Sequence, residues 1–191
     1  MEPAKKKTFR RISETYLHNA GLHYLQRFAT GEGNFRRVMK RKIDNSCRAH
    51  PDQDRADCLR MLDELVTKFR RSGLLDDGNY AGAAVRTMRR RGLSARAINA
   101  KLTAKGVAVE IVATAIAACD AELKSQNGDM VAAARHAMRR RLGPFARATT
   151  EERTSKELSS FARAGFSYEI AQRILKMDMG DIETLATGDS A

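Results

Sequence analysis

The sequence predicts an all-α protein of tandem three-helix, helix-turn-helix-like repeats that form an elongated, curved molecule. The composition favours helices, because 42% of the 191 residues are hydrophobic while only 6% are aromatic and only 3 are proline. Apolar residues recur at helical spacing, with capping residues and glycines between the segments. Central helices are expected to begin at Asn34, Ser94 and Thr154, about sixty residues apart, and such a period is typical of repeat proteins.

The first repeat is expected over residues 13–72. Its first helix runs from about 13 to 29 and carries Leu17, Ala20, Tyr24 and Phe28 on one face. A second helix follows from Asn34 and ends before Pro51, because proline disfavours helix at and before its own position. A third helix then runs from about 55 to 71 and completes the unit.

The second repeat, residues 73–126, has the clearest helix boundaries. Asp76 is placed to cap a first helix, which ends at Gly92. Ser94 is placed to cap a second helix, which ends at Gly106. Polar side chains at helix starts and glycines just past helix ends are the expected boundary residues. A third helix with an apolar stripe follows, and together the three helices are long enough to form one small packed unit.

The third repeat is expected over residues 127–177, and its first helix over 129–142. Two overlapping capping boxes, Thr149-x-x-Glu152 and Thr154-x-x-Glu157, each fit the start of the next helix. The sequence leaves both starts open. Ser167 is placed to cap a last helix, which completes the repeat.

The two ends of the chain are expected to be flexible. Residues 1–12 are polar and basic and form a predicted arm, while residues 178–191 are acidic and small and form a predicted tail. Terminal segments without an apolar stripe have little to bury, and they remain solvated.

The formal net charge of +12 indicates an acidic partner such as nucleic acid. The alternative is that the arginines form a solvated surface that binds no partner. No helix pairs a basic face with a large aromatic face, so a membrane surface is not expected. The 3 cysteines are odd in number and lie at apolar-face positions, which favours reduced thiols. With no apolar run behind its N-terminal lysines, the chain is expected to be cytoplasmic.

Three clusters of cations, one in each repeat, are the candidate binding residues. Arginine offers a planar fork that suits phosphate or carboxylate. Any one cluster alone is typical of a solvated helix face, but three of them suggest a continuous basic surface. The predicted surface consists of Arg36, Arg37, Lys40, Arg41, Arg86, Arg89, Arg90, Arg91, Lys101, Lys105, Arg135, Arg139, Arg140 and Arg141.

The sequence shows no set of residues that would support catalysis. It has no phosphate-binding G-x-x-x-x-G-K-[ST] loop and no dinucleotide fingerprint. Cys47, His50 and Cys58 resemble part of a zinc site, but a fourth ligand at the usual spacing is missing. We therefore expect no catalytic residues, no metal, no cofactor and no enzymatic activity.

Three stretches resemble a known family. Gly73-Leu-Leu-Asp-Asp-Gly-Asn-Tyr-Ala81 is similar to the joint "G-[LY]-[LI]-[DN]-D-x-x-[FY]-A" of the RecX regulators of the RecA recombinase. Arg91 to Val107 resembles the helix and turn that follow in that family, and Ala164 to Leu175 resembles its C-terminal repeat. The matching structural positions are Leu75, Asp76, Asp77, Tyr80, Ala81, Gly92, Ser94, Ile98, Leu102 and Gly106.

The resemblance implies an all-helical protein that lies in the groove of the RecA filament on single-stranded DNA. Family members of this kind lower the recombinase, ATPase and coprotease activities of RecA in recombination, DNA repair and the SOS response. The implied partners are the RecA filament and single-stranded DNA, with weaker binding to duplex DNA, and we expect a monomer. A sequence-specific, duplex-binding helix-turn-helix transcription regulator is the alternative, centred on residues 94–105.

Overall fold

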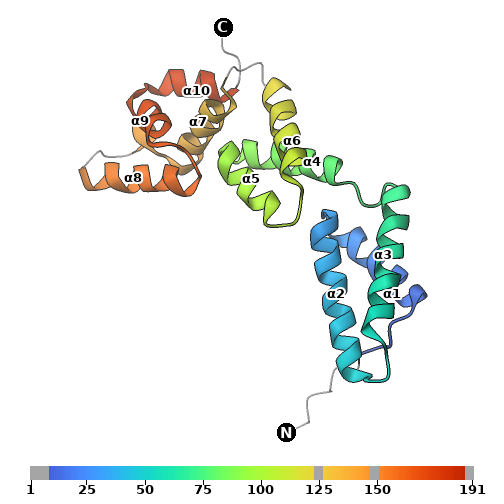
Figure 1. The fold of residues 1–191 in the computed structure, drawn as a ribbon. Helices are drawn as coiled ribbons and strands as arrows, with labels where there is room; N and C mark the ends of the chain where they lie inside the picture. Colours follow the sequence, from blue (N-terminus) through green and yellow to red (C-terminus); the bar gives the residue numbers. More distant parts are fainter. Residues whose placement is uncertain (1–8, 123–126, 147–150, 188–191) are drawn as a thin grey trace. The chain divides into compact units, whose positions relative to one another are not determined.

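The structure is a computed structural model that describes residues 9–122, 127–146 and 151–187. These residues form ten α-helices and one 3-10 turn, and no strand occurs among them, which confirms the predicted all-α class (Figure 1). The chain divides into two compact units after Tyr80. Each unit has its own apolar core.

Unit 1 is a three-helix bundle of α1 (Glu14–Arg27), α2 (Glu32–Ala49) and α3 (Arg55–Arg71) (Figure 1). Ser13 caps α1 and Asp54 caps α3 through their side chains. Helical spacing places apolar residues of all three helices in one core. Its most deeply buried side chains are Leu17, Phe35, Met39, Ile43, Leu62 and Phe69.

The segment before α1 is held against unit 1, so the predicted flexible arm is wrong for residues 9–12. Ile12 is buried, and its backbone N–H donates to Oε1 of Gln53 at 3.1 Å while Nε2 of Gln53 donates back to its carbonyl at 2.7 Å. The hydroxyl of Ser46 donates to the carbonyl of Arg10 at 2.9 Å. Residues 1–8 of the predicted arm lie outside the described part of the chain.

Two further predictions for unit 1 are wrong. Phe28 follows the end of α1 in an extended conformation, and its side chain is 52% exposed rather than packed inside. Helix α2 begins at Glu32 rather than Asn34, because the carboxylate of Asp77 accepts the backbone N–H of Glu32 at 2.7 Å. This cap comes from a residue far along the chain, so local sequence does not reveal it.

Unit 2 contains most of α4 (Asp77–Arg90), followed by α5 (Ala95–Thr103), α6 (Val109–Glu122), α7 (Gly128–Arg140), α8 (Glu151–Arg163) and α9 (Tyr168–Lys176). A short 3-10 turn at Gly143–Phe145 follows α7. Helix α8 begins at Glu151, so Thr154 lies inside it and the predicted start at Thr154 is wrong; Thr149 lies outside the described residues.

The predicted acidic tail is wrong over most of its length. Residues Met179–Thr187 form a further helix, α10, which packs beside α7 (Figure 1). Ile182 and Ala186 of this helix are buried in the core of unit 2, on the side of α10 away from its acidic residues. Helix α10 is therefore an integral part of unit 2.

Candidate basic binding surfaces

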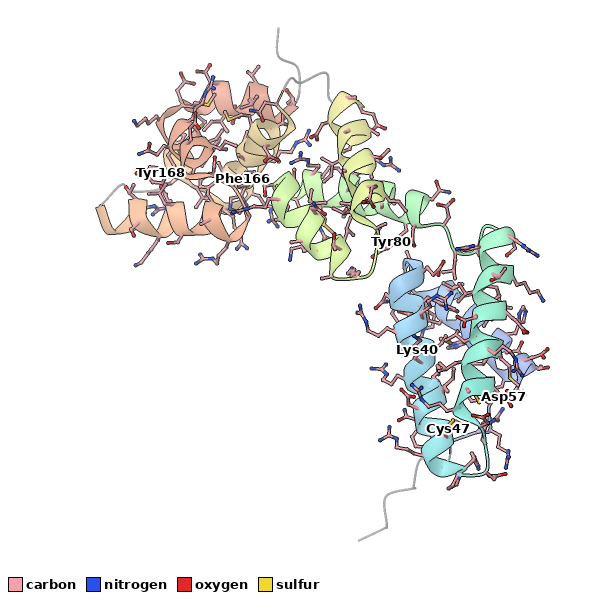
Figure 2. The ribbon with its side chains drawn as sticks, viewed as in Figure 1. Lys40, Cys47, Asp57, Tyr80, Phe166 and Tyr168 are labelled. Atoms are coloured by element: carbon pink, nitrogen blue, oxygen red, sulfur yellow. The ribbon has the colours of Figure 1, made fainter. Side chains whose placement is uncertain are left out.

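Helix α2 presents one of the predicted clusters to solvent. Arg37, Lys40 and Arg41 are exposed on the face of α2 opposite its buried residues, and Figure 2 shows Lys40 on this helix. Arg36 differs, since its side chain is half-buried and forms ion pairs with Glu32 at 2.8 Å and with Asp63. Its charge is thus largely compensated within the protein.

Arg89 is not part of an exposed basic surface, and this prediction is wrong. Its side chain is 2% exposed and forms ion pairs with Asp120 at 2.6 Å and with Asp129. Arg89 follows Ala81 and Val85 at intervals of four residues, so it continues the buried stripe of α4. That spacing is the sequence signal by which its burial could have been recognised.

The neighbours of Arg89 in the same cluster are exposed. Arg90 and Arg91 lie at the end of α4, and Arg86 has Glu122 at 4.0 Å. Lys101 and Lys105 are exposed on α5 and in the turn that follows it. All side chains of the second predicted cluster except Arg89 are therefore exposed to solvent.

The third cluster is divided in the same way. Arg139, Arg140 and Arg141 are exposed at the end of α7, whereas Arg135 is half-buried and its Nε donates to the carbonyl of Ala186 at 2.8 Å. Burial, together with the charges of Arg89 and Arg90, lowers the pKa of Arg135. The guanidinium of Arg135 is thus engaged in holding α10, and a binding role for Arg135 stays a prediction.

The second and third clusters approach each other in unit 2. Gly92, with a positive φ of 73°, packs so closely on α7 that a Cβ atom would collide with the backbone of Ala132 and His136. The charge of Arg90 acts on Arg135 across this contact. Exposed arginines at the ends of α4 and α7 therefore belong to one region of unit 2, while the α2 cluster belongs to unit 1.

The residues of the family motif lie where they support the fold. Six of them are buried: Leu75, Ala81, Gly92, Ser94, Ile98 and Leu102. Asp76 accepts the backbone N–H of Asn79 at 2.9 Å, and Asp77 caps α2. Tyr80 is half-buried where the units divide, and Gly106 has a positive φ of 88°.

Sequence analysis missed a groove in unit 1 between the segment before α1, α1 itself and α2. It has a volume of about 770 Å³. Its residues come from three segments, which explains why no single pattern revealed it. It is lined by Arg10, Arg11, Ser13, Thr15, Tyr16, Asn19, Ala20, His23, Tyr24, Arg27, Phe28 and Lys42.

Within the described residues, no three histidine, cysteine or acidic side chains are grouped to hold a metal ion. The three cysteines are unpaired, and burial raises the pKa of the Cys58 thiol to about 11. Among the helices that the structure describes, none is both long and apolar enough to cross a bilayer.

Comparison with known proteins identifies the family. Residues 76–116 match the model of the second three-helix domain of RecX. The regulatory protein RecX of Myxococcus xanthus (strain DK1622) is 39% identical over 168 residues, which cover 87% of this chain and 87% of that protein. This chain belongs to the RecX family.

Other RecX proteins are similar over parts of the chain. The regulatory protein RecX of Agrobacterium fabrum is 38% identical over 112 residues, or 58% of this chain and 56% of that protein. The crystal structure of RecX from Lactobacillus salivarius matches 85% of this chain and 94% of its own, with a TM-score of 0.53 and 23% sequence identity. At that identity, the match to the RecX structure shows that the fold is shared.

Proposed function

We propose that this chain regulates the RecA recombinase by binding the RecA filament on single-stranded DNA and lowering its recombinase, ATPase and coprotease activities. The proposed setting is recombination, DNA repair and the SOS response in the cytoplasm. The observation that carries the proposal is the 39% identity to a regulatory protein RecX over 87% of the chain. The match extends over both compact units, so it is not confined to one shared motif.

The charge distribution supports a binding role without catalysis. Exposed cations occur on α2 of unit 1 and at the ends of α4 and α7 in unit 2. A filament of protein and DNA offers repeated phosphates and carboxylates to such surfaces. Several weak contacts made by one chain add to a high overall affinity when their geometry allows simultaneous binding. The chain is therefore expected to act by binding rather than as an enzyme.

The test is the single-stranded-DNA-dependent ATPase of the cognate RecA, titrated with this protein well below one molecule per subunit. We expect inhibition at these ratios and weaker inhibition with the double variant Arg90→Ala/Arg91→Ala. A matched control, Arg60→Ala/Lys68→Ala, removes the same charge from exposed positions of α3 and is expected to inhibit like wild type. An unchanged ATPase at one molecule per subunit would contradict the proposal.

The alternative, a duplex-reading helix-turn-helix, is less well supported by the geometry of unit 2. A recognition helix places its N-terminal residues against base edges in the major groove. At the start of α5, the backbone N–H of Ser94 donates to the carbonyl of Ala164 at 3.1 Å, and Nε of Arg96 donates to the carbonyl of Gly165 at 3.2 Å. The turn between α8 and α9 thus covers this end, and the next helix, α6, contains no Lys or Arg.

A further inference from the structure

The groove in unit 1 combines cationic and aromatic side chains, and none of the described residues that line it is a carboxylate. Arg10, Arg27 and Lys42 line it, and within the described part of the chain none of them forms an ion pair. Arg11 contributes less charge, since its guanidinium pairs with Asp52 at 2.6 Å and both side chains are more than half exposed. The groove therefore has a positive lining that is not compensated from within.

A second hollow of about 540 Å³ continues the groove toward α2. Both share Arg10, Tyr16 and Lys42, and the second adds Arg41 and Phe9. Of the residues that the structure describes, no carboxylate lines this part either. The two hollows together form a positively lined path, which we call the unit 1 groove.

Aromatic rings in the unit 1 groove are held in place and partly exposed. Phe28 is 52% exposed as a residue, and its ring lies 5.2 Å from that of Tyr24, at an interplanar angle of 37°. Tyr24 is fixed in turn, because its hydroxyl accepts from Nδ2 of Asn34 at 3.0 Å. Phe9, 41% exposed, is anchored by its carbonyl, which accepts from the ring of His50 at 2.9 Å.

This combination has a definite chemical match. A positive groove follows a phosphate backbone, and exposed aromatic rings stack on bases whose faces are free. Bases in a duplex are already stacked and do not offer these faces. An acidic peptide would satisfy the cations but would leave Phe28 and Phe9 exposed to water.

We propose that the unit 1 groove binds single-stranded nucleic acid, with phosphates against Arg10, Arg27 and Lys42 and bases stacked on Phe28 and Phe9. This deepens the proposed function and rests on it for its biological setting, since single-stranded DNA is the strand within the RecA filament. The binding itself needs no recombinase. It can therefore be measured on the chain alone.

The experiment uses fluorescence anisotropy of a fluorescein-labelled oligothymidylate of about 20 nucleotides, long enough for the site sizes typical of such grooves. An oligomer of the same length with abasic residues keeps the phosphates and removes the bases. We expect Phe28→Ala to weaken binding of the oligothymidylate by about 5- to 160-fold, as loss of one stacked base does. Binding of the abasic oligomer should change by less than about threefold, since the phosphate contacts remain.

Two further variants separate stacking from charge. Phe28→Leu keeps an apolar side chain and should weaken binding nearly as much as Phe28→Ala. Arg27→Ala/Lys42→Ala should weaken both oligomers and reduce the slope of log affinity against log salt by about 1.4. Arg60→Ala/Lys68→Ala, which removes the same charge outside the groove, should leave both unchanged. The circular dichroism of every variant should match wild type, because the substituted side chains are exposed or line the open groove.

Oligothymidylate binding that is unchanged in Phe28→Ala, or equal wild-type affinity for the two oligomers, would overturn the proposal. The recombinase ATPase separates the two proposals. If wild type inhibits the ATPase while Phe28→Ala binds oligothymidylate normally, the groove proposal fails and the regulatory function stands. If Phe28→Ala loses binding while wild type leaves the ATPase unchanged, the groove stands and the regulatory function fails.

Discussion

Arg89 connects four elements of unit 2 through one guanidinium. Its Nε and Nη2 donate to Asp120 at the end of α6, and its Nη1 donates to Asp129 in the first turn of α7 and to the carbonyl of Leu93. Asp129 also accepts the backbone N–H of Ala95, the first residue of α5, at 2.8 Å. The ion pairs with Asp129 and Asp120 outweigh the cost of burial and raise the pKa of Arg89.

Replacement of Arg89 by methionine tests this role. Arg89→Met leaves two carboxylates without their cation in a partly buried site, and we expect the free energy of unfolding to fall by about 3 kcal/mol. Urea unfolding followed by circular dichroism measures the change. Arg91→Met, at an exposed position of the same cluster, should change stability by less than about 0.5 kcal/mol. A similar small effect in Arg89→Met would contradict the structural role.

His136 is buried between α7 and α8 among aromatic rings. Its Nε2 lies 3.0 Å from the hydroxyl of Ser160, and its ring centroid lies 5.2 Å from that of Phe161 and 6.0 Å from that of Phe166, which Figure 2 labels. Burial first, and then the charges of Arg139 and Arg140, lower the pKa of His136 to about 4. The folded protein therefore keeps this ring neutral well below neutral pH.

The free energy of unfolding is expected to fall as the pH is lowered, because of His136. In the unfolded chain the ring returns to its ordinary pKa of about 6.5, so between that value and about 4 the unfolded state binds a proton that the folded state lacks. Between about pH 7.5 and pH 5 this linkage removes about 2 kcal/mol of unfolding free energy.

Urea unfolding at the two pH values should show a larger loss for wild type than for His136→Gln. His23→Gln, at an exposed position, should retain the wild-type loss. Equal losses for wild type and His136→Gln would contradict the linkage.

At the scale of helices, one junction recurs in unit 2. Gly92 with Ser94 joins α4 to α5, and Gly165 with Ser167 joins α8 to α9. Both glycines have positive φ values, 73° and 91°, and both serines cap the next helix with φ of −69° and ψ within one degree of 160°. The local geometry of the two junctions is thus the same.

Helix α10 shows how an acidic segment can still be structural. Its exposed face carries Asp181 and Glu183, while Ile182 is fully buried against unit 2. We expect Ile182→Ala to lower the free energy of unfolding by about 3 kcal/mol, through lost apolar burial and the cavity left behind. Glu183→Ala should have an effect below about 0.5 kcal/mol. Thermal unfolding measures the stability of both variants. Equal losses of stability in Ile182→Ala and Glu183→Ala would contradict the packing of α10 against unit 2.

Across the whole molecule, the distinction between paired and exposed cations decides how the net charge of +12 can act on a partner. Arg89 and Arg36 are engaged by carboxylates, and Arg135 by a backbone carbonyl. Arg90, Arg91, Arg139 and Arg140 remain exposed. Only the exposed groups can displace counterions from phosphates without first breaking an internal contact.

Binding to single-stranded DNA should accordingly weaken steeply with salt. If about 6–10 phosphates are contacted, affinity should fall by about 10³–10⁵-fold between about 50 and 200 mM salt. Arg90→Ala/Arg91→Ala should reduce the slope of log affinity against log salt by about 1.4, whereas Arg36→Ala should leave it nearly unchanged. Anisotropy titrations over a salt series measure both. If Arg36→Ala changed the slope as much as Arg90→Ala/Arg91→Ala does, the distinction between paired and exposed cations would be contradicted.

The sequence by itself determined the all-α class, most helix positions and much of the apolar face of the predicted helices. These follow from local rules, since Ser94 caps α5 and Ser167 caps α9 through contacts three residues away. It also identified the family through the joint at residues 73–81. The predicted elongated, curved shape stays a prediction.

Only the tertiary structure decided which polar and aromatic residues face solvent. Asp77 caps α2 although it lies 45 residues from Glu32 in the sequence, and Arg89 pairs with Asp129, which lies 40 residues away in the sequence. Phe28 is exposed because α1 ends before it, and the unit 1 groove joins cations from three segments. Such contacts depend on how helices pack rather than on the period within any one helix. A stretch of sequence can therefore predict a helix and its apolar face, but not which of its charges another helix will neutralise.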